Sequence, residues 1–111
     1  MIKILLAASL LSTLSMFSQG GSLDTSFGTG GKVTTSINSG ADIAYATVLQ
    51  SDGKILVSGT TNSSISGKDF FCIRYNTDGT LDTSFGTNGI ATFDLQGGSD
   101  DVAYAMSLLS D

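Results

Sequence analysis

Four segments along the chain are rich in apolar and β-branched residues, which is the pattern of short β-strands. These segments are 32–37, 43–49, 54–58 and 70–75. The pair Asp52-Gly53 separates the second segment from the third, and Asp78-Gly79 follows the fourth. Asp-Gly after an apolar run favours a tight turn, because the turn needs a residue with positive φ. The pattern predicts an antiparallel, all-β unit of four strands.

The second of these segments is apolar on both of the faces that a strand would present. Strict alternation places bulky residues on one face and small ones on the other, namely Ile43, Tyr45 and Leu49 against Ala44, Ala46 and Val48. A sheet with one face in water would instead alternate apolar with polar residues. We therefore expect this sheet to have neighbours above and below it, as a blade in a propeller has.

An internal repeat organises the chain. The heptapeptide Leu-Asp-Thr-Ser-Phe-Gly-Thr at 23–29 recurs without change at 81–87, and the related segments 42–46 and 101–105 follow in register apart from one inserted residue. The spacing between the two copies, 58 residues from Leu23 to Leu81, is in the range typical of solenoids, propellers and arrays. The expected organisation is a first repeat at 21–80 and a second at 81–111, which ends before its last two strands.

The repeated residues resemble a known family. The stretches LDTSFGTGGKV, DGKILVSG and DFFCIRYNTDGTLDTSFG are similar to the delta-60 repeat of bacterial secreted and surface proteins. The resemblance extends from Leu23 to Asp111. It implies a β-propeller in which each repeat supplies about one blade, and it implies no catalytic residues. The expected fold is therefore an antiparallel four-stranded β-propeller blade plus the first half of a second blade, an incomplete propeller.

The first twenty residues have the features of a secretory signal peptide. Lys3 provides a positive start, an apolar body extends to Phe17, and small residues follow at Ser18 and Gly20. This order is that of a cleaved leader, and the apolar stretch is shorter than the roughly 20 residues of a membrane span. We expect residues 1–20 to be removed, no membrane insertion afterwards, and a secreted or cell-surface location.

Composition excludes several kinds of function. The net charge is −5 and all ten acidic residues are Asp, which argues against nucleic-acid binding, since that needs a basic surface. The chain has no His, so catalytic triads and metal sites that depend on histidine are impossible. The single Cys72 lies between Phe71 and Ile73 and is expected to be a buried, inert thiol.

Few residues are candidates for chemistry. The Gly-rich run at 28–33 is not a phosphate loop, because Val33 follows the lysine where Ser or Thr is needed. Asp78 and Asp82 leave open a weak calcium site outside any EF-hand loop, whereas Asp94 and Asp100 are expected to be solvated loop residues. We predict no catalytic, cofactor-binding or metal-binding residue, and no cofactor.

Two functions fit these observations. The first is a non-enzymatic scaffold for a protein or glycan ligand, with the polar stretch 60–67 as the variable loop. The alternative is part of a secreted enzyme, for example a carbohydrate-active one, whose active site lies on other repeats or domains. We expect this sequence to be a fragment that self-associates through its open edge strand rather than forming a closed monomer.

Overall fold

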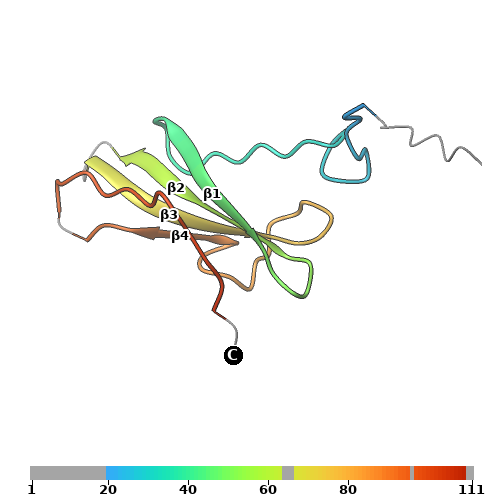
Figure 1. Ribbon diagram of the computed structural model, residues 1–111. Helices are drawn as coiled ribbons and strands as arrows, with labels where there is room; N and C mark the ends of the chain where they lie inside the picture. The colour runs from blue at the N-terminus through green and yellow to red at the C-terminus, as the bar shows by residue number, and fades with distance from the viewer. Residues whose placement is uncertain (1–19, 64–66, 96, 110–111) are drawn as a thin grey trace, which may run out of the picture.

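The structure is a computed structural model, and it describes residues 20–63, 67–95 and 97–109. These residues form one sheet (Figure 1) of four strands: β1 (Asp42–Leu49), β2 (Ile55–Ser63), β3 (Gly67–Tyr75) and β4 (Ile90–Phe93). The strand order is β1-β2-β3-β4, and each neighbouring pair is antiparallel. The predicted all-β class and antiparallel four-stranded sheet are confirmed. The expected signal peptide falls almost wholly on residues 1–19, which lie outside the described residues.

Both predicted Asp-Gly turns are present. Between β1 and β2, Gln50 N donates to Lys54 O (2.8 Å) and Gly53 N donates to Gln50 O (2.9 Å). After β3, Asn76 N donates to Thr80 O (2.8 Å), and Gly79 closes the turn with a φ of 86°. The positive φ that Asp-Gly permits therefore fixes both reversals of the chain.

The predicted first strand, over 32–37, is wrong. Residues 33–37 have no strand pairing in the described chain, and they run as an extended segment toward β1. The corresponding residues of the second repeat form β4, which pairs with β3 from Phe70↔Phe93 to Ile73↔Ile90. The sheet thus takes three strands from the first repeat and its fourth from the second, which pairs with the outer edge of β3.

The expected alternation along β1 is also wrong, because β1 contains a bulge. The register changes between Ala44↔Gly59 and Ala46↔Ser58, which leaves Tyr45 as an extra residue. Beyond the bulge every side chain moves to the other face. One face therefore carries Ile43, Ala46 and Val48, and the other carries Ala44, Thr47 and Leu49.

The polar stretch expected as a loop at 60–67 mostly belongs to strands. β2 continues to Ser63 and β3 begins at Gly67. Thr60 and Thr61 are buried, and Thr61 Oγ1 donates to Asp42 Oδ1 (2.5 Å) on β1. Threonine is a good strand residue, so the polar composition of this stretch misled the prediction.

Segments outside the strands cover the two faces of the sheet. On one face, Tyr75 Oη and Thr35 Oγ1 are hydrogen-bonded (2.6 Å), and Asn38 Nδ2 donates to Thr61 Oγ1 (3.1 Å). On the other face, Thr60 Oγ1 donates to Asp101 O (3.0 Å) at the start of segment 101–109. Segment 101–109, expected to begin a second blade, forms no described strand.

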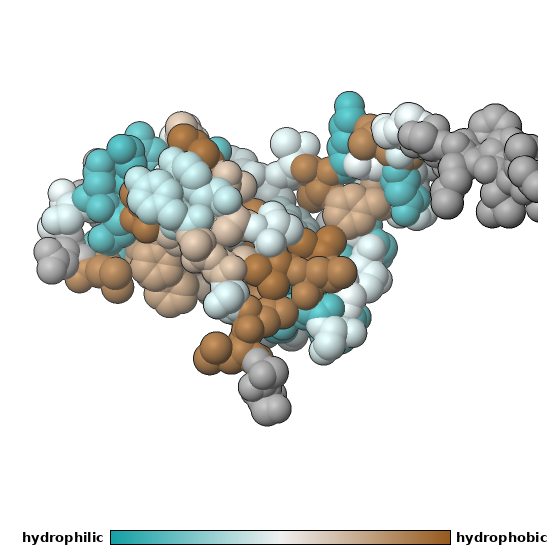
Figure 2. Space-filling model, viewed as in Figure 1, coloured by the Kyte–Doolittle hydropathy of each residue, from teal (hydrophilic) through white to brown (hydrophobic). Residues whose placement is uncertain are grey.

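The apolar core is small. Among the described residues, Phe71 and Ile73 are the buried hydrophobic side chains, each 3% exposed. Large apolar side chains remain exposed on the strands and on the two flanking segments, including Ile43, Leu49, Phe93 and Leu109. Figure 2 shows apolar residues gathered along the last described segment and the adjacent part of the sheet. Apolar surface of this kind marks a face that packs against a neighbour.

Candidate functional site

A charged cluster lies at the end of the sheet where β2 begins and β3 ends. The pairing Ile55↔Tyr75 brings the preceding residues Lys54 and Arg74 to the same end. Asp82, from the second heptapeptide, accepts hydrogen bonds at Oδ2 from Lys54 Nζ (2.8 Å) and Arg74 Nε (2.7 Å). The Asp82 side chain is 8% exposed, so one nearly buried carboxylate joins two strands.

The remaining bonds of the second heptapeptide hold it against Arg74. Asp82 Oδ1 accepts from Ser84 N (3.1 Å) and Ser84 Oγ (2.6 Å), and Asp82 N donates to Arg74 O (2.9 Å). The Arg74 guanidinium lies 4.8 Å from the centre of the Phe85 ring, a cation–π contact. The heptapeptide therefore works as a clasp that fixes the entry to β4.

The pKa of the Asp82 carboxyl lies well below its usual range. The hydrogen bond from Lys54 is the main cause, and the Ser84 and Arg74 donors add to it against the opposing effect of burial. All of these donors stabilise the ionised form. Asp82 is consequently charged at any pH near neutrality.

The first heptapeptide has the same internal bonds without the external ones. Asp24 Oδ1 accepts from Ser26 N (2.9 Å) and Ser26 Oγ (2.6 Å), which lowers the pKa of Asp24. Asp24 is exposed, and no Lys or Arg of the described chain forms an ion pair with it. The two copies thus share a local fold, but only the second is tied to the sheet by ion pairs in the described chain.

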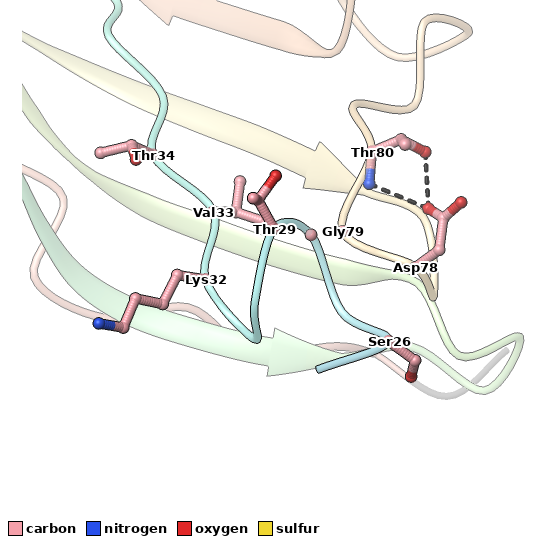
Figure 3. A pocket seen from close by; sticks show the side chains of 9 residues that line it. Ser26, Thr29, Lys32, Val33, Thr34, Asp78, Gly79 and Thr80 are labelled. Carbon is pink, nitrogen blue, oxygen red and sulfur yellow. Dashed lines mark hydrogen bonds between the residues drawn. The ribbon is translucent and has the colours of Figure 1, made fainter. Parts of the chain in front are cut away.

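The Gly-rich run at 28–33 lines a pocket of about 710 Å³ together with the turn that follows β3 (Figure 3). Gly28 N donates to Asp78 O (2.8 Å) across it. The pocket's one carboxylate, Asp78, accepts from Thr80 N (2.9 Å) and Thr80 Oγ1 (2.7 Å). The lining also contains Lys32 and the hydroxyl groups of Ser26, Thr29, Thr34 and Thr80.

The equivalent run of the second repeat lines a similar hollow. Gly86, Thr87 and the residues of β4 from Ile90 to Thr92 border a pocket of about 410 Å³, with Ile37 and Asn38 opposite. The two hollows share the kind of wall that follows each heptapeptide, but the other wall differs: it is the turn at 78–80 in the first and Ile37 and Asn38 in the second.

The carboxylates considered for calcium are engaged within the protein. Asp82 pairs with two cationic side chains, and Asp78 accepts both Thr80 donors. A cation at Asp82 would have to displace Lys54 and Arg74. The two loop residues lie apart: Asp100 pairs with Lys68 (3.0 Å) at the surface, and Asp94 is exposed.

The fold also brings together three carboxylates that the sequence did not connect. One oxygen each of Asp69, Asp94 and Asp101 lies within 4.8 Å of the others. Oxygen ligands of this type suit hard cations such as calcium. However, Asp101 Oδ2 already accepts from Leu95 N (2.7 Å), and in the first repeat Asp42 Oδ2 accepts from Ile37 N (2.9 Å) in the same way. Asp101 and Asp42 therefore have the same structural role in the two repeats: each holds the backbone at the start of the short connector that precedes it. We assign no metal site here.

Cys72 is half-buried in β3. Burial raises the pKa of its thiol, and the nearby Arg74 opposes this only in part. The thiol is therefore largely protonated at neutral pH, which makes it a poor nucleophile.

Comparison with known proteins found a match, which covers part of the sheet and the second heptapeptide. Residues 50–85 match the family model described as "Domain of unknown function (DUF5122) beta-propeller". The matched segment contains β2, β3 and the second heptapeptide as far as Phe85. No curated protein and no solved structure matched the chain. The match supports a β-propeller repeat family, and the four-stranded sheet is consistent with part of one blade.

Proposed function

We propose that this chain belongs to a secreted or cell-surface protein of the delta-60 type, whose propeller blades are a non-enzymatic scaffold for a protein or glycan ligand. The proposal rests on one observation: the aspartates that recur in both repeats hold the local backbone in place. Asp24 and Asp82 hold their heptapeptides, and Asp42 and Asp101 hold the connectors before β1 and its second copy. Acidic residues that recur for structural reasons are not the paired acid and base of a hydrolase.

Support for export comes from the leader-like residues 1–20. The ligand, on this proposal, contacts the connector before β1 and its counterpart in the second repeat. The connector at 38–41 in the first repeat corresponds to 96–100 in the second, which is one residue longer and carries Asp100. Variation in the length and residues of such connectors is typical of repeat scaffolds that present binding loops.

A connector exchange tests this function. We expect a protein or glycan that binds the chain to bind severalfold more weakly when residues 96–100 are replaced by the sequence of 38–41, measured by calorimetry or on a glycan array. The melting temperature should hardly change, because the exposed Lys68–Asp100 pair lost in the exchange contributes little stability. Ligand that is cleaved rather than bound intact, or binding that the exchange leaves unaltered, would contradict the proposal.

A further inference from the structure

Two tyrosines from equivalent positions of the two repeats lie against each other at the surface. Tyr45 of β1 corresponds to Tyr104 of the second repeat, and we call these residues the tyrosine pair. Their ring centres are 5.1 Å apart, and the ring planes are inclined at 53°. They meet because segment 101–109 crosses one face of the sheet (Figure 1), where Asp101 O accepts from Thr60 Oγ1. The two repeats therefore form this aromatic surface together.

The tyrosine pair keeps much of its surface open to a ligand. Tyr45 is 44% exposed and Tyr104 is 70% exposed. Neither phenol hydroxyl forms a hydrogen bond with another residue of the described chain. The third tyrosine of the sequence differs in this respect, because the hydroxyl groups of Tyr75 and Thr35 are hydrogen-bonded. Packing within the chain thus accounts for Tyr75 but leaves the exposed pair without a structural explanation.

The bulge of β1 falls on a member of the tyrosine pair. Tyr45 is the extra residue between the pairings Ala44↔Gly59 and Ala46↔Ser58, so it has no partner on β2. The strands come this close only because Gly59 lacks a Cβ, which would overlap the backbone of β1. Bulges are common next to functional sites, where they re-aim a side chain. The sheet therefore departs from regular pairing at the residue that meets the second repeat.

An exposed ion pair lies beside the two rings. Lys68 Nζ donates to Asp100 Oδ2 (3.0 Å), and the two side chains are 47% and 58% exposed. The pKa of Lys68 is raised mainly by its hydrogen bond to Asp100 and, to a smaller extent, by the nearby Tyr45 and Tyr104. The ammonium group keeps further N–H donors, and the carboxylate keeps further acceptor positions. Aromatic rings and accessible polar groups of both kinds therefore share one surface.

We propose that the tyrosine pair and the Lys68–Asp100 ion pair bind a hexopyranose unit of a glycan. One face of such a sugar presents C–H groups, which pack on the negatively polarised face of an aromatic ring. Its hydroxyl groups both donate and accept, so they bond to the ion pair and replace its water. An apolar protein surface would bury the ion pair without such partners, at a cost in free energy.

This inference rests on the proposed scaffold function and narrows its ligand to a glycan. The position of the site agrees with that function, because Asp100 belongs to the longer connector of the second repeat. The tyrosine pair adds what the connector alone lacks, a broad and rigid contact surface. Tyrosine supplies such a surface at a low cost in conformational entropy.

The variant Tyr104→Ala tests the site in the full chain. An array of oligosaccharides of glucose, galactose, mannose and N-acetylglucosamine identifies the glycan, and calorimetry with that glycan gives the affinity. We expect Tyr104→Ala to weaken binding about tenfold, the loss of one aromatic contact. Tyr104→Phe keeps the ring and should retain most of the affinity. The control Leu109→Ala removes a 90% exposed apolar side chain from the same segment and should leave binding unchanged.

Tyrosine fluorescence gives a second measurement. The chain has no Trp and three Tyr, so the glycan should alter the fluorescence of the full chain. The circular-dichroism spectrum of Tyr104→Ala should match that of the parent chain, because the replaced side chain is largely exposed.

Three results would overturn the glycan site. The first is that no oligosaccharide on the array binds, even if a protein ligand does. The second is that Tyr104→Ala binds the glycan as tightly as the parent chain. The third is a ligand whose binding falls when residues 96–100 are exchanged but not in Tyr104→Ala. This third result would leave the proposed scaffold function in place, so the two proposals fail separately.

Discussion

Replacing Asp82 by Asn is expected to lower the melting temperature of the protein by about 5 °C or more. The change leaves Lys54 and Arg74 facing each other without the carboxylate that accepts from both. It also weakens the clasp that fixes β4, since Arg74 orients Phe85 and Ser84 as well. Thermal unfolding followed by circular dichroism measures the effect.

The matched control is Asp24→Asn, the same substitution in the same heptapeptide. Among the described residues the Asp24 carboxylate accepts only from Ser26, so its replacement should leave the melting temperature nearly unchanged. The difference between the variants should also fade in acid. Because the folded pKa of Asp82 lies below the ordinary value of 3.8, its stabilising effect is complete above that value and is lost as the pH falls below it. Equal effects of the two substitutions would show that the ion pairs at Asp82 contribute nothing.

Gly59→Ala is expected to destabilise the sheet by about 2 kcal/mol or more, as overpacking does in close-packed interiors. Gly59 lies in β2 opposite the bulge of β1, where a Cβ would overlap the Ile43 carbonyl oxygen and lie 2.9 Å from Ala44 Cα. Both atoms belong to backbone and cannot turn aside as a side chain can. Chemical denaturation, followed by the circular-dichroism signal of the β-sheet, gives the free energy of unfolding.

Gly97→Ala provides the comparison for this substitution. An added Cβ at Gly97 meets nothing within 4 Å, so the free energy of unfolding should be unchanged or slightly raised. If Gly59→Ala proved equally harmless, the bulge would have to be absent or able to move, and the assignment of faces along β1 would fail with it.

Local signals in the sequence were sufficient for three of the four strands. β1, the start of β2 and most of β3 follow from apolar runs bounded by Asp-Gly turns. The bulge at Tyr45 left no such signal, because it arises from the close approach of Gly59 on the neighbouring strand. The role of residues 32–37 was equally hidden: a strand needs an edge to pair with, and the sequence of the segment does not say which sheet supplies it.

The charged cluster shows the same limit. The repeat marked Asp82 as structural, but its ion pairs with Lys54 and Arg74 depend on the register of β2 with β3. The grouping of Asp69, Asp94 and Asp101 likewise depends on how the connector after β4 returns to β3. Contacts between residues distant in sequence follow from the pairing of strands and are not encoded in any short motif.

The account depends most on the claim that one sheet combines three strands of the first repeat with one of the second. The direct measurement is disulfide formation in the variant Ala91→Cys, since Ala91 lies opposite Cys72. Mild oxidation followed by peptide mapping should find a disulfide between position 91 and Cys72 within single molecules, in clear excess over the bond formed by Thr92→Cys, which faces the other side of the sheet. The claim would be contradicted if the new thiol at position 91 failed to pair with Cys72, or if positions 91 and 92 gave equal yields. Either result would show that β4 of the second repeat does not pair with β3 of the first.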